Sequence, residues 1–287
     1  MTLDDQLHGL STLILSSWPN VSSGASGFFF QQLEHPDPEK QKTGEGYWRA
    51  IEQLWLVTNR HVLVSQDNTL AESLTFHVRK LTRGLEWHSI VLDRDQLYKR
   101  VFFHPNSEAD VAAIRVIDLL TELLQFTHEQ EKWMNWFAVS EDNFPGENKI
   151  SVEAADDVIV VGYPRGFYDT HNLFPILKSG VIATRWGAHF EGKPCFLIDA
   201  KLFPGSSGSI VISKPIGAVI EDGKLFQAKT KQFAFLGVFS GEPFRRNQPI
   251  ELENMTIIEK ESFNVGIVWY YWLVNETINN GKQFNQT

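Results

Sequence analysis

The chain has 287 residues, of which 43% are hydrophobic and 21% are charged, and its formal net charge is −9. This composition is that of a folded globular protein of one or two domains. It argues against a nucleic-acid groove, which needs clustered Lys and Arg, and a single cysteine leaves no intrachain disulfide and no zinc cluster.

The one cysteine, Cys195, lies in the apolar run 194–198, so we expect a buried structural thiol rather than a nucleophile. The first residues include early acids and no apolar stretch typical of a secretory signal. No run approaches the ~20 apolar residues of a membrane span. We therefore expect a cytoplasmic chain with neither a membrane nor a nucleic-acid partner.

Strand signals dominate in chain order. Short apolar or alternating runs, separated by Gly and Pro, predict strands at residues 12–15, 27–30, 54–58, 74–79, 87–92, 111–116, 158–161, 196–198, 209–212 and 233–239. The Ser/Gly cluster 22–26 precedes the second of them. Such short, punctuated strands predict a barrel or a sandwich rather than alternating strand–helix units.

Three segments differ from this pattern. Residues 35–46 are polar and rich in Pro and Gly, which predicts an exposed loop. Residues 117–136 favour a helix, so we expect residues 121–155 to connect two β-rich halves. Residues 269–278 could form a closing helix.

Three positions could carry chemistry. His61 follows the apolar run 54–58, where a lone histidine is usually structural. Asp110 directly precedes the run 111–116, where an aspartate is commonly a turn or cap residue. The pattern Gly205-x-Ser207-Gly208 suits a nucleophile on a tight turn, with backbone N–H groups aimed at a forming oxyanion, although Ser/Gly turns are common.

The three positions are more informative together. Their order along the chain, His61, Asp110 and then Ser207, is one of the known orders of a catalytic triad. The first two fall in the first β-rich half and the serine falls in the second. An active site in a cleft between two halves needs that distribution.

This set of motifs resembles the trypsin-like (chymotrypsin-fold) serine peptidases, and most closely the disulfide-free bacterial branch that includes the HtrA-type proteases. The matching segments, in family order, are 58–62, 110–114, 160–164, 179–183, 198–200, 204–209 and 236–238. The HtrA comparison covers the protease part only, because no C-terminal segment is long enough for a PDZ domain.

The resemblance implies an all-β fold of two six-stranded antiparallel β-barrels with a C-terminal helix. Residues 1–140 would form the N-terminal barrel, which carries His61 and Asp110, together with the connecting segment. Residues 141–287 would form the C-terminal barrel, which carries Ser207, and the helix.

The resemblance also implies a serine endopeptidase that forms an acyl-enzyme and needs no metal or organic cofactor. Ser207 would be the nucleophile, His61 its base and Asp110 the group that orients the base. The N–H groups of Gly205 and Ser207 would form the oxyanion hole. The partner is a polypeptide substrate, and an activating protein partner is also implied, because the nucleophile loop of relatives can be disordered until one binds.

Residues that touch substrate follow from the same resemblance. Lys201 falls near the base of the first specificity pocket, and pointing inward it would favour acidic or polar residues. Pointing outward it would leave an apolar pocket formed by Leu202 and Phe203, which we favour. The strand residues Val238, Phe239 and Ser240 would pair with an extended substrate, and the hydroxyl of Ser240 either binds Asp110 or is a plain strand-end hydroxyl.

Two other readings remain to be compared. A catalytically silent binding module could keep this fold, because fold alone never proves activity. An α/β-hydrolase esterase is disfavoured, because that class orders its triad Ser, acid, His and places the serine on a strand-to-helix elbow.

Overall fold

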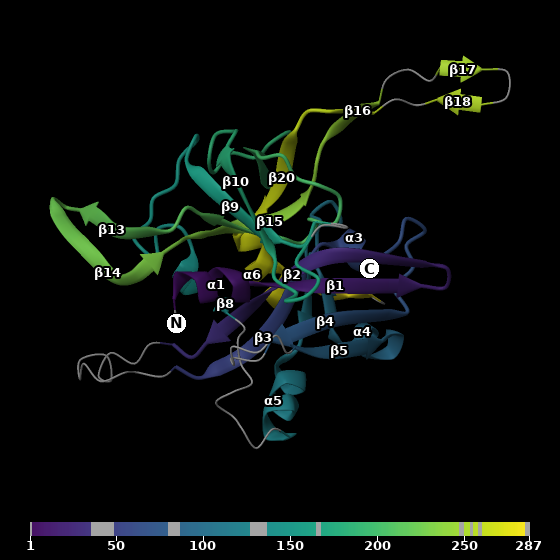
Figure 1. Cartoon of the computed structure of the whole chain (residues 1–287), viewed down its shortest axis with the longest axis horizontal. Coiled ribbons are helices and arrows are strands. Elements are labelled where there is room, and N and C mark those ends of the chain that lie inside the picture. Colours follow the sequence, from purple (N-terminus) through teal and green to yellow (C-terminus); the bar gives the residue numbers. More distant parts are fainter. Residues whose placement is uncertain are drawn as a thin grey trace.

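The chain folds into two β-rich halves that lie against each other (Figure 1). The computed structural model describes residues 2–35, 49–79, 87–126, 137–164, 168–246, 250–252, 255–257 and 260–284. The loop expected at residues 35–46 lies outside the described residues except for His35. None of the helices in these ranges is long and apolar enough to cross a membrane.

The N-terminal half contains most of the short helices. Its elements are α1 (Leu3–Gly9), β1 (Ser11–Trp18), β2 (Val21–Leu33), β3 (Ile51–Thr58), α3 (Arg60–Leu63), β4 (Ser73–Arg79), β5 (Trp87–Asp93), α4 (Arg94–Arg100), β6 (Val101–Phe103), β7 (Ala112–Arg115), α5 (Ile117–Phe126) and β8 (Ala138–Val139). The predicted helix after residue 117 is present as α5, and residues 127–136 are outside the described ranges.

The C-terminal half is almost entirely strands. After the short helix η1 (Glu141–Asn143), its elements are β9 (Asp157–Gly162), β10 (Ile176–Ile182), β11 (Cys195–Asp199), β12 (Ile210–Ser213), β13 (Ile216–Glu221), β14 (Lys224–Gln232), β15 (Phe235–Gly241), β16 (Phe244–Arg246), β17 (Ile250–Leu252), β18 (Met255–Ile257), β19 (Lys260–Ser262), β20 (Val265–Tyr270), α6 (Trp272–Asn280) and β21 (Lys282–Gln283). The expected C-terminal helix is confirmed as α6.

One of the two expected barrels is confirmed. Strands β10, β11, β20, β15, β12 and β9 close a six-stranded barrel in the C-terminal half. The N-terminal half is instead an open nine-stranded sheet, in the order β21-β6-β7-β3-β2-β1-β4-β5, with β8 beside β2. The expectation of two complete barrels is therefore not confirmed.

The helix α4 packs against the open N-terminal sheet. Asp93 ends β5 and begins α4 with a capping box, in which its side chain accepts from the N–H of Gln96 and the Gln96 side chain accepts from the Asp93 N–H. The helix α4 then contacts β5 at one edge of the sheet and β21 at the other. The helix therefore lies against both edge strands of the sheet, which do not pair with each other in the described residues.

Apolar side chains join the two halves. One buried cluster takes Phe28 and Val57 from the N-terminal sheet and Val161, Phe235 and Val238 from the barrel. The rings of Phe28 and Phe235 are edge-to-face, with centroids 5.3 Å apart. Packed interiors resist displacement, so this cluster fixes how the strands that carry the candidate site face each other.

The predicted strands are present, with two informative differences. The Ser/Gly cluster at 22–26 belongs to β2, which begins at Val21 and pairs along β1, so the turn lies earlier, at residues 19–20. The hairpin of β13 and β14 was not anticipated, and it projects from the barrel (Figure 1). Both of these strands are largely exposed, so no buried apolar run marked them.

Candidate active site

His61 is positioned by the end of β3 and the start of α3. The strand ends at Thr58, and the buried Asn59 adopts an extended conformation before the helix begins at Arg60. The Asn59 side chain makes no helix-cap hydrogen bond; its Nδ2 instead donates to the backbone carbonyl of Asp110 at 2.7 Å. The turn that presents His61 is therefore tied to the loop that presents Asp110.

Asp110 lies in the loop between β6 and β7 and accepts three hydrogen bonds through its carboxylate. His61 contributes two of them, from its backbone N–H to Oδ1 at 3.0 Å and from its ring Nδ1 to Oδ2 at 2.6 Å. The hydroxyl of Ser240 donates to the same Oδ2 at 2.6 Å. Because an ionised carboxylate only accepts, the proton of the neutral ring lies on Nδ1, and Nε2 is left as an acceptor.

Asp110 also sets the proton affinity of the ring. Burial disfavours the protonated imidazole, but the hydrogen bond and the negative charge of Asp110 outweigh it, so the pKa of His61 lies above its usual value. About half of the His61 side chain stays exposed. The ring is thus a base that an incoming group can reach.

In the loop that carries Ser207, some backbone N–H groups donate hydrogen bonds within the protein and others do not. The N–H groups of Ser206, Gly208 and Ser209 donate to backbone carbonyls of the loop or of β15. In the described part of the chain, the N–H groups of Gly205 and Ser207 donate to no acceptor. Two neighbouring free donors beside a serine hydroxyl are what an oxyanion hole requires, and Gly205 reaches this geometry with a φ of +91°, which favours glycine.

The hydroxyl of Ser207 does not bind His61 in this structure. Its Oγ donates to the backbone carbonyl of Ser240 at 2.8 Å, and among the described residues no hydrogen bond joins it to the imidazole. Ser240 consequently contacts two of the three expected triad members, Asp110 through its hydroxyl and Ser207 through its carbonyl. Ser207 and His61 are thus linked through Ser240 and Asp110 rather than directly.

The strand residues expected to pair with substrate differ in accessibility. Val238 and Phe239 are buried, and their backbones pair within the barrel, with β12 or the nucleophile loop on one side and β20 on the other. Ser240 is partly exposed and lies at the bulge of β15, between the paired residues Phe239 and Gly241. A peptide strand could therefore add to β15 only from Ser240 onward.

The side chains expected near the specificity pocket differ in exposure. Lys201 is exposed. Leu202, expected to line an apolar pocket, is instead buried in the barrel core, where the other core side chains surround it. Phe203 is 48% exposed, and the ammonium of Lys178 lies 5.4 Å from the centroid of its ring. This surface beside the nucleophile loop is apolar with a basic rim.

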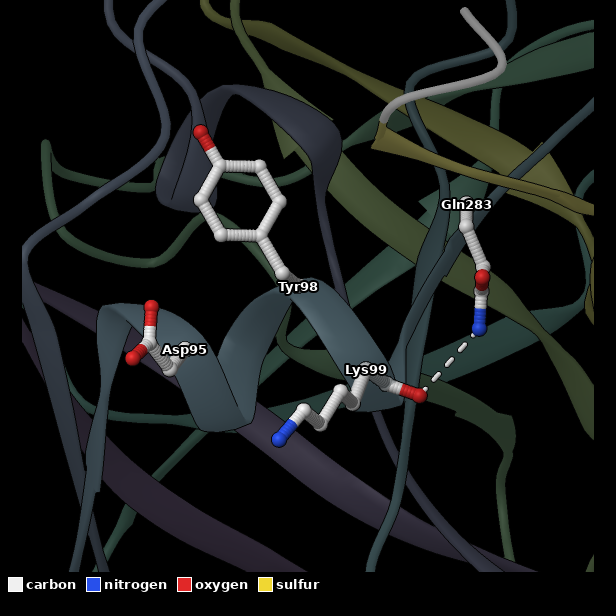
Figure 2. Close-up of a pocket in the computed structure, with 4 residues that line it drawn as sticks. All are labelled: Asp95, Tyr98, Lys99 and Gln283. Carbon is white, nitrogen blue, oxygen red and sulfur yellow. Dashed lines mark hydrogen bonds between the residues drawn. The ribbon is translucent and has the colours of Figure 1, made fainter.

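The remaining candidate features lie elsewhere. Cys195 is buried, as expected, and burial raises the pKa of its thiol to about 11. No group of three or more His, Cys, Asp and Glu side chains in the described ranges is placed to hold a metal ion. An open pocket of about 530 Å³ is lined by Asp95, Tyr98, Lys99 and Gln283, none of which belongs to the candidate site. Figure 2 shows these four side chains.

A closed barrel facing a curled sheet, with a His–Asp pair on one side and a serine loop on the other, defines the class of chymotrypsin-type peptidases. The family model for the trypsin-like peptidase domain matches residues 44–220, which is more than half of the chain. The chain therefore belongs to the trypsin-like peptidase domain family, and the resemblance drawn from the motifs is confirmed. No curated protein matches the chain.

Several solved structures are similar over nearly the whole chain. The thermostable serine protease AL20 from an extremophilic microorganism is 11% identical, with a TM-score of 0.48, and the match covers 95% of this chain and 96% of that one. The protease Anisep from Arthrobacter nicotinovorans is 12% identical, with a TM-score of 0.48 and coverages of 95% and 94%. The Rv3671c protease from M. tuberculosis, in its active form, is 15% identical, with a TM-score of 0.44 and coverages of 99% and 86%.

Two residues with structural roles at the site were missed in the sequence. Asn59 stands within the histidine motif, and its amide could have been recognised as a partner for a nearby loop. Ser26 belongs to the Ser/Gly cluster that precedes a predicted strand, and composition alone does not distinguish it from its neighbours. Only the pairing of β2 with other elements reveals what its polar groups contact.

Proposed function

We propose that this peptidase is a serine endopeptidase in which Ser207, His61 and Asp110 form the catalytic triad. The observation that carries the proposal is the carboxylate of Asp110, which accepts both the ring Nδ1 and the backbone N–H of His61. Two hydrogen bonds to one residue fix both the tautomer and the orientation of the ring. A histidine held for purely structural reasons does not need a free, exposed Nε2.

The proposed reaction begins with a rotation of the Ser207 hydroxyl from the Ser240 carbonyl to Nε2 of His61. Ser207 Oγ then attacks the peptide carbonyl carbon while its proton passes to Nε2. The negative charge that forms on the carbonyl oxygen is bound by the N–H groups of Gly205 and Ser207. Collapse of this intermediate expels the amine, which takes the proton from the imidazolium of His61.

Water completes the cycle. It attacks the ester on Ser207, gives one proton to Nε2 of His61, and the acid product leaves as the serine recovers that proton. Asp110 stays ionised throughout and stabilises the imidazolium in both halves. The residues present need no metal ion or organic cofactor for these steps.

The substrate is a polypeptide that adds to β15 from Ser240 onward. The exposure of Lys201 and of the Phe203 ring supports the apolar version of the specificity pocket, with Phe203 as its exposed ring. Lys178 and Lys201 add positive charge at its rim, so we expect apolar residues before the cleaved bond and tolerance of acidic neighbours. Clean cleavage after Arg would contradict this preference.

The competing function is a silent binding module. One observation favours it: the hydroxyl of Ser207 donates its hydrogen bond to the carbonyl of Ser240 rather than to His61. Incubating a peptide library with the wild type, Ser207→Ala and His61→Ala separates the two functions. We expect cleavage by the wild type only, whereas equal absence of cleavage from all three folded proteins would support the binding module.

A further inference from the structure

Ser26 is a fully buried serine of β2 that contacts the nucleophile loop from the opposite half of the molecule. Its backbone N–H donates to the carbonyl of Ser207 at 2.8 Å. Its hydroxyl donates to the carbonyl of Gly205 at 3.4 Å. Ser26 therefore binds the residues on both sides of Ser206, the two whose N–H groups are left free.

The other polar groups of Ser26 reach two further elements. Its Oγ accepts the N–H of Tyr163, just after β9, at 2.8 Å. Its carbonyl accepts the hydroxyl of Thr58 at 2.8 Å, and Thr58 lies at the end of β3, in the motif that presents His61. The same residue thus contacts the barrel, the nucleophile loop and the strand that leads to the base.

Gly208 shows how closely the loop is seated on Ser26. A Cβ on Gly208 would lie 2.1 Å from the carbonyl oxygen of Ser26 and 2.4 Å from Oγ1 of Thr58. No side chain fits at this distance. The glycine that follows Ser207 is therefore required by the approach of β2, as well as by its φ of +80°.

We propose that the hydroxyl of Ser26 is a positioning group that holds the nucleophile loop in the conformation with both oxyanion donors free. The backbone bonds to Ser207 and Thr58 would form with any residue at this position. The hydroxyl joins the carbonyl of Gly205 to the N–H of Tyr163, so it is the side-chain group of Ser26 that ties the Gly205 end of the loop to the barrel. The catalytic consequence of this restraint rests on the proposed function, whereas the restraint itself does not.

The variant Ser26→Ala tests the restraint, with Ser11→Ala as its matched control. Ser11 is a buried serine of the neighbouring strand β1, and its hydroxyl donates to the carbonyl of Gly27 at 2.9 Å without touching the loop. Amide hydrogen exchange of the peptide that covers residues 203–209 is measured by mass spectrometry. We expect about tenfold faster exchange in Ser26→Ala than in the wild type or the control, with residues 87–93 unchanged in all three.

A kinetic arm tests the catalytic consequence. With a cleavable peptide, Ser26→Ala should lower kcat about tenfold, with KM within twofold of the wild-type value. The variant should also lose more affinity for a peptide boronate, which binds in the oxyanion hole, than for the cleavage product. A merely structural role would lower the melting temperature without this split. Ser26→Cys keeps about the size of the side chain but has only a weak hydrogen-bonding group, so it should behave like Ser26→Ala. It replaces Ser26→Ala in both experiments if the alanine variant does not fold.

The two possible failures are distinguishable. Equal exchange of residues 203–209 in all variants would overturn the role of Ser26, whatever the activity. Faster exchange with wild-type kcat would overturn its catalytic consequence. If the wild type shows no hydrolysis that depends on Ser207, the proposed function fails, and the exchange comparison still decides whether Ser26 restrains the loop.

Discussion

Replacing Gly208 by alanine probes the contact between the two halves most sharply. The added Cβ would meet the Ser26 carbonyl oxygen at 2.1 Å and the Thr58 hydroxyl at 2.4 Å. Both neighbours are themselves fixed, since the Thr58 hydroxyl donates to the Ser26 carbonyl and both residues are fully buried. Neither can move away as the end of a flexible side chain could, so the loop itself must shift.

The expected cost has two parts. A left-handed backbone costs a residue with a Cβ about 1–2 kcal/mol, and this applies at Gly208, where φ is +80°. Overpacking in a closed interior adds about 1–3 kcal/mol. Gly208→Ala should therefore lower the free energy of unfolding by about 2–5 kcal/mol.

Gly146→Ala is the matched control, because Gly146 has a φ of +90° and nothing within 4 Å of an added Cβ. It should lose only the backbone part, about 1–2 kcal/mol. Urea denaturation of both variants and the wild type measures the difference. If Gly208→Ala is no less stable than Gly146→Ala, the close contact between the loop of residues 203–209 and Ser26 of β2 is contradicted.

Three further predictions concern the same network. The pKa of His61, followed by NMR titration, should fall in Asp110→Asn, because burial then acts without the opposing charge, and an unchanged pKa in the variant would contradict this cause. In the wild type, kcat/KM should fall as the pH drops through the raised pKa, because the ring must be neutral to accept a proton, and a kcat/KM that does not change with pH in this range would be the contrary result. Ser240→Ala removes one of three donors to Asp110 and should lower kcat about tenfold in steady-state hydrolysis, whereas wild-type turnover would show that this bond is dispensable. Arg79→Met removes hydrogen bonds from the partly buried guanidinium to the Tyr163 hydroxyl and to the backbone carbonyl of Asn172, and should lower the unfolding free energy in urea by about 2–4 kcal/mol; a loss under about 0.5 kcal/mol would be the contrary result.

The sequence predicted those parts of the molecule that depend on local pattern. Short apolar runs identified the core strands, because a buried strand needs a continuous or alternating apolar face. The order of His61, Asp110 and Ser207 placed two residues on one half and one on the other. The structure confirms that His61 and Asp110 meet, while the role of Ser207 stays a prediction.

The missed features depend on long-range contacts. Whether the N-terminal sheet closes depends on whether its edge strands β5 and β21 pair, and these strands lie far apart along the chain. Ser26 sits in a cluster of small residues whose composition also suits a turn, and its partners lie 32 to 181 positions away along the chain, at Thr58 and Ser207. The Ser207 hydroxyl points to the backbone carbonyl of Ser240, and a sequence motif does not specify this side-chain conformation.

The most direct test of the central claim is covalent labelling of Ser207. Folded wild-type protein is incubated with a fluorophosphonate, which reacts with activated serine hydroxyls, and the adduct is located by peptide mass spectrometry. We predict a single adduct on Ser207, absent from Ser207→Ala and greatly slowed in His61→Ala. Folded wild type that stays unlabelled, or an adduct on another serine, would contradict the assignment of this chain as a serine peptidase.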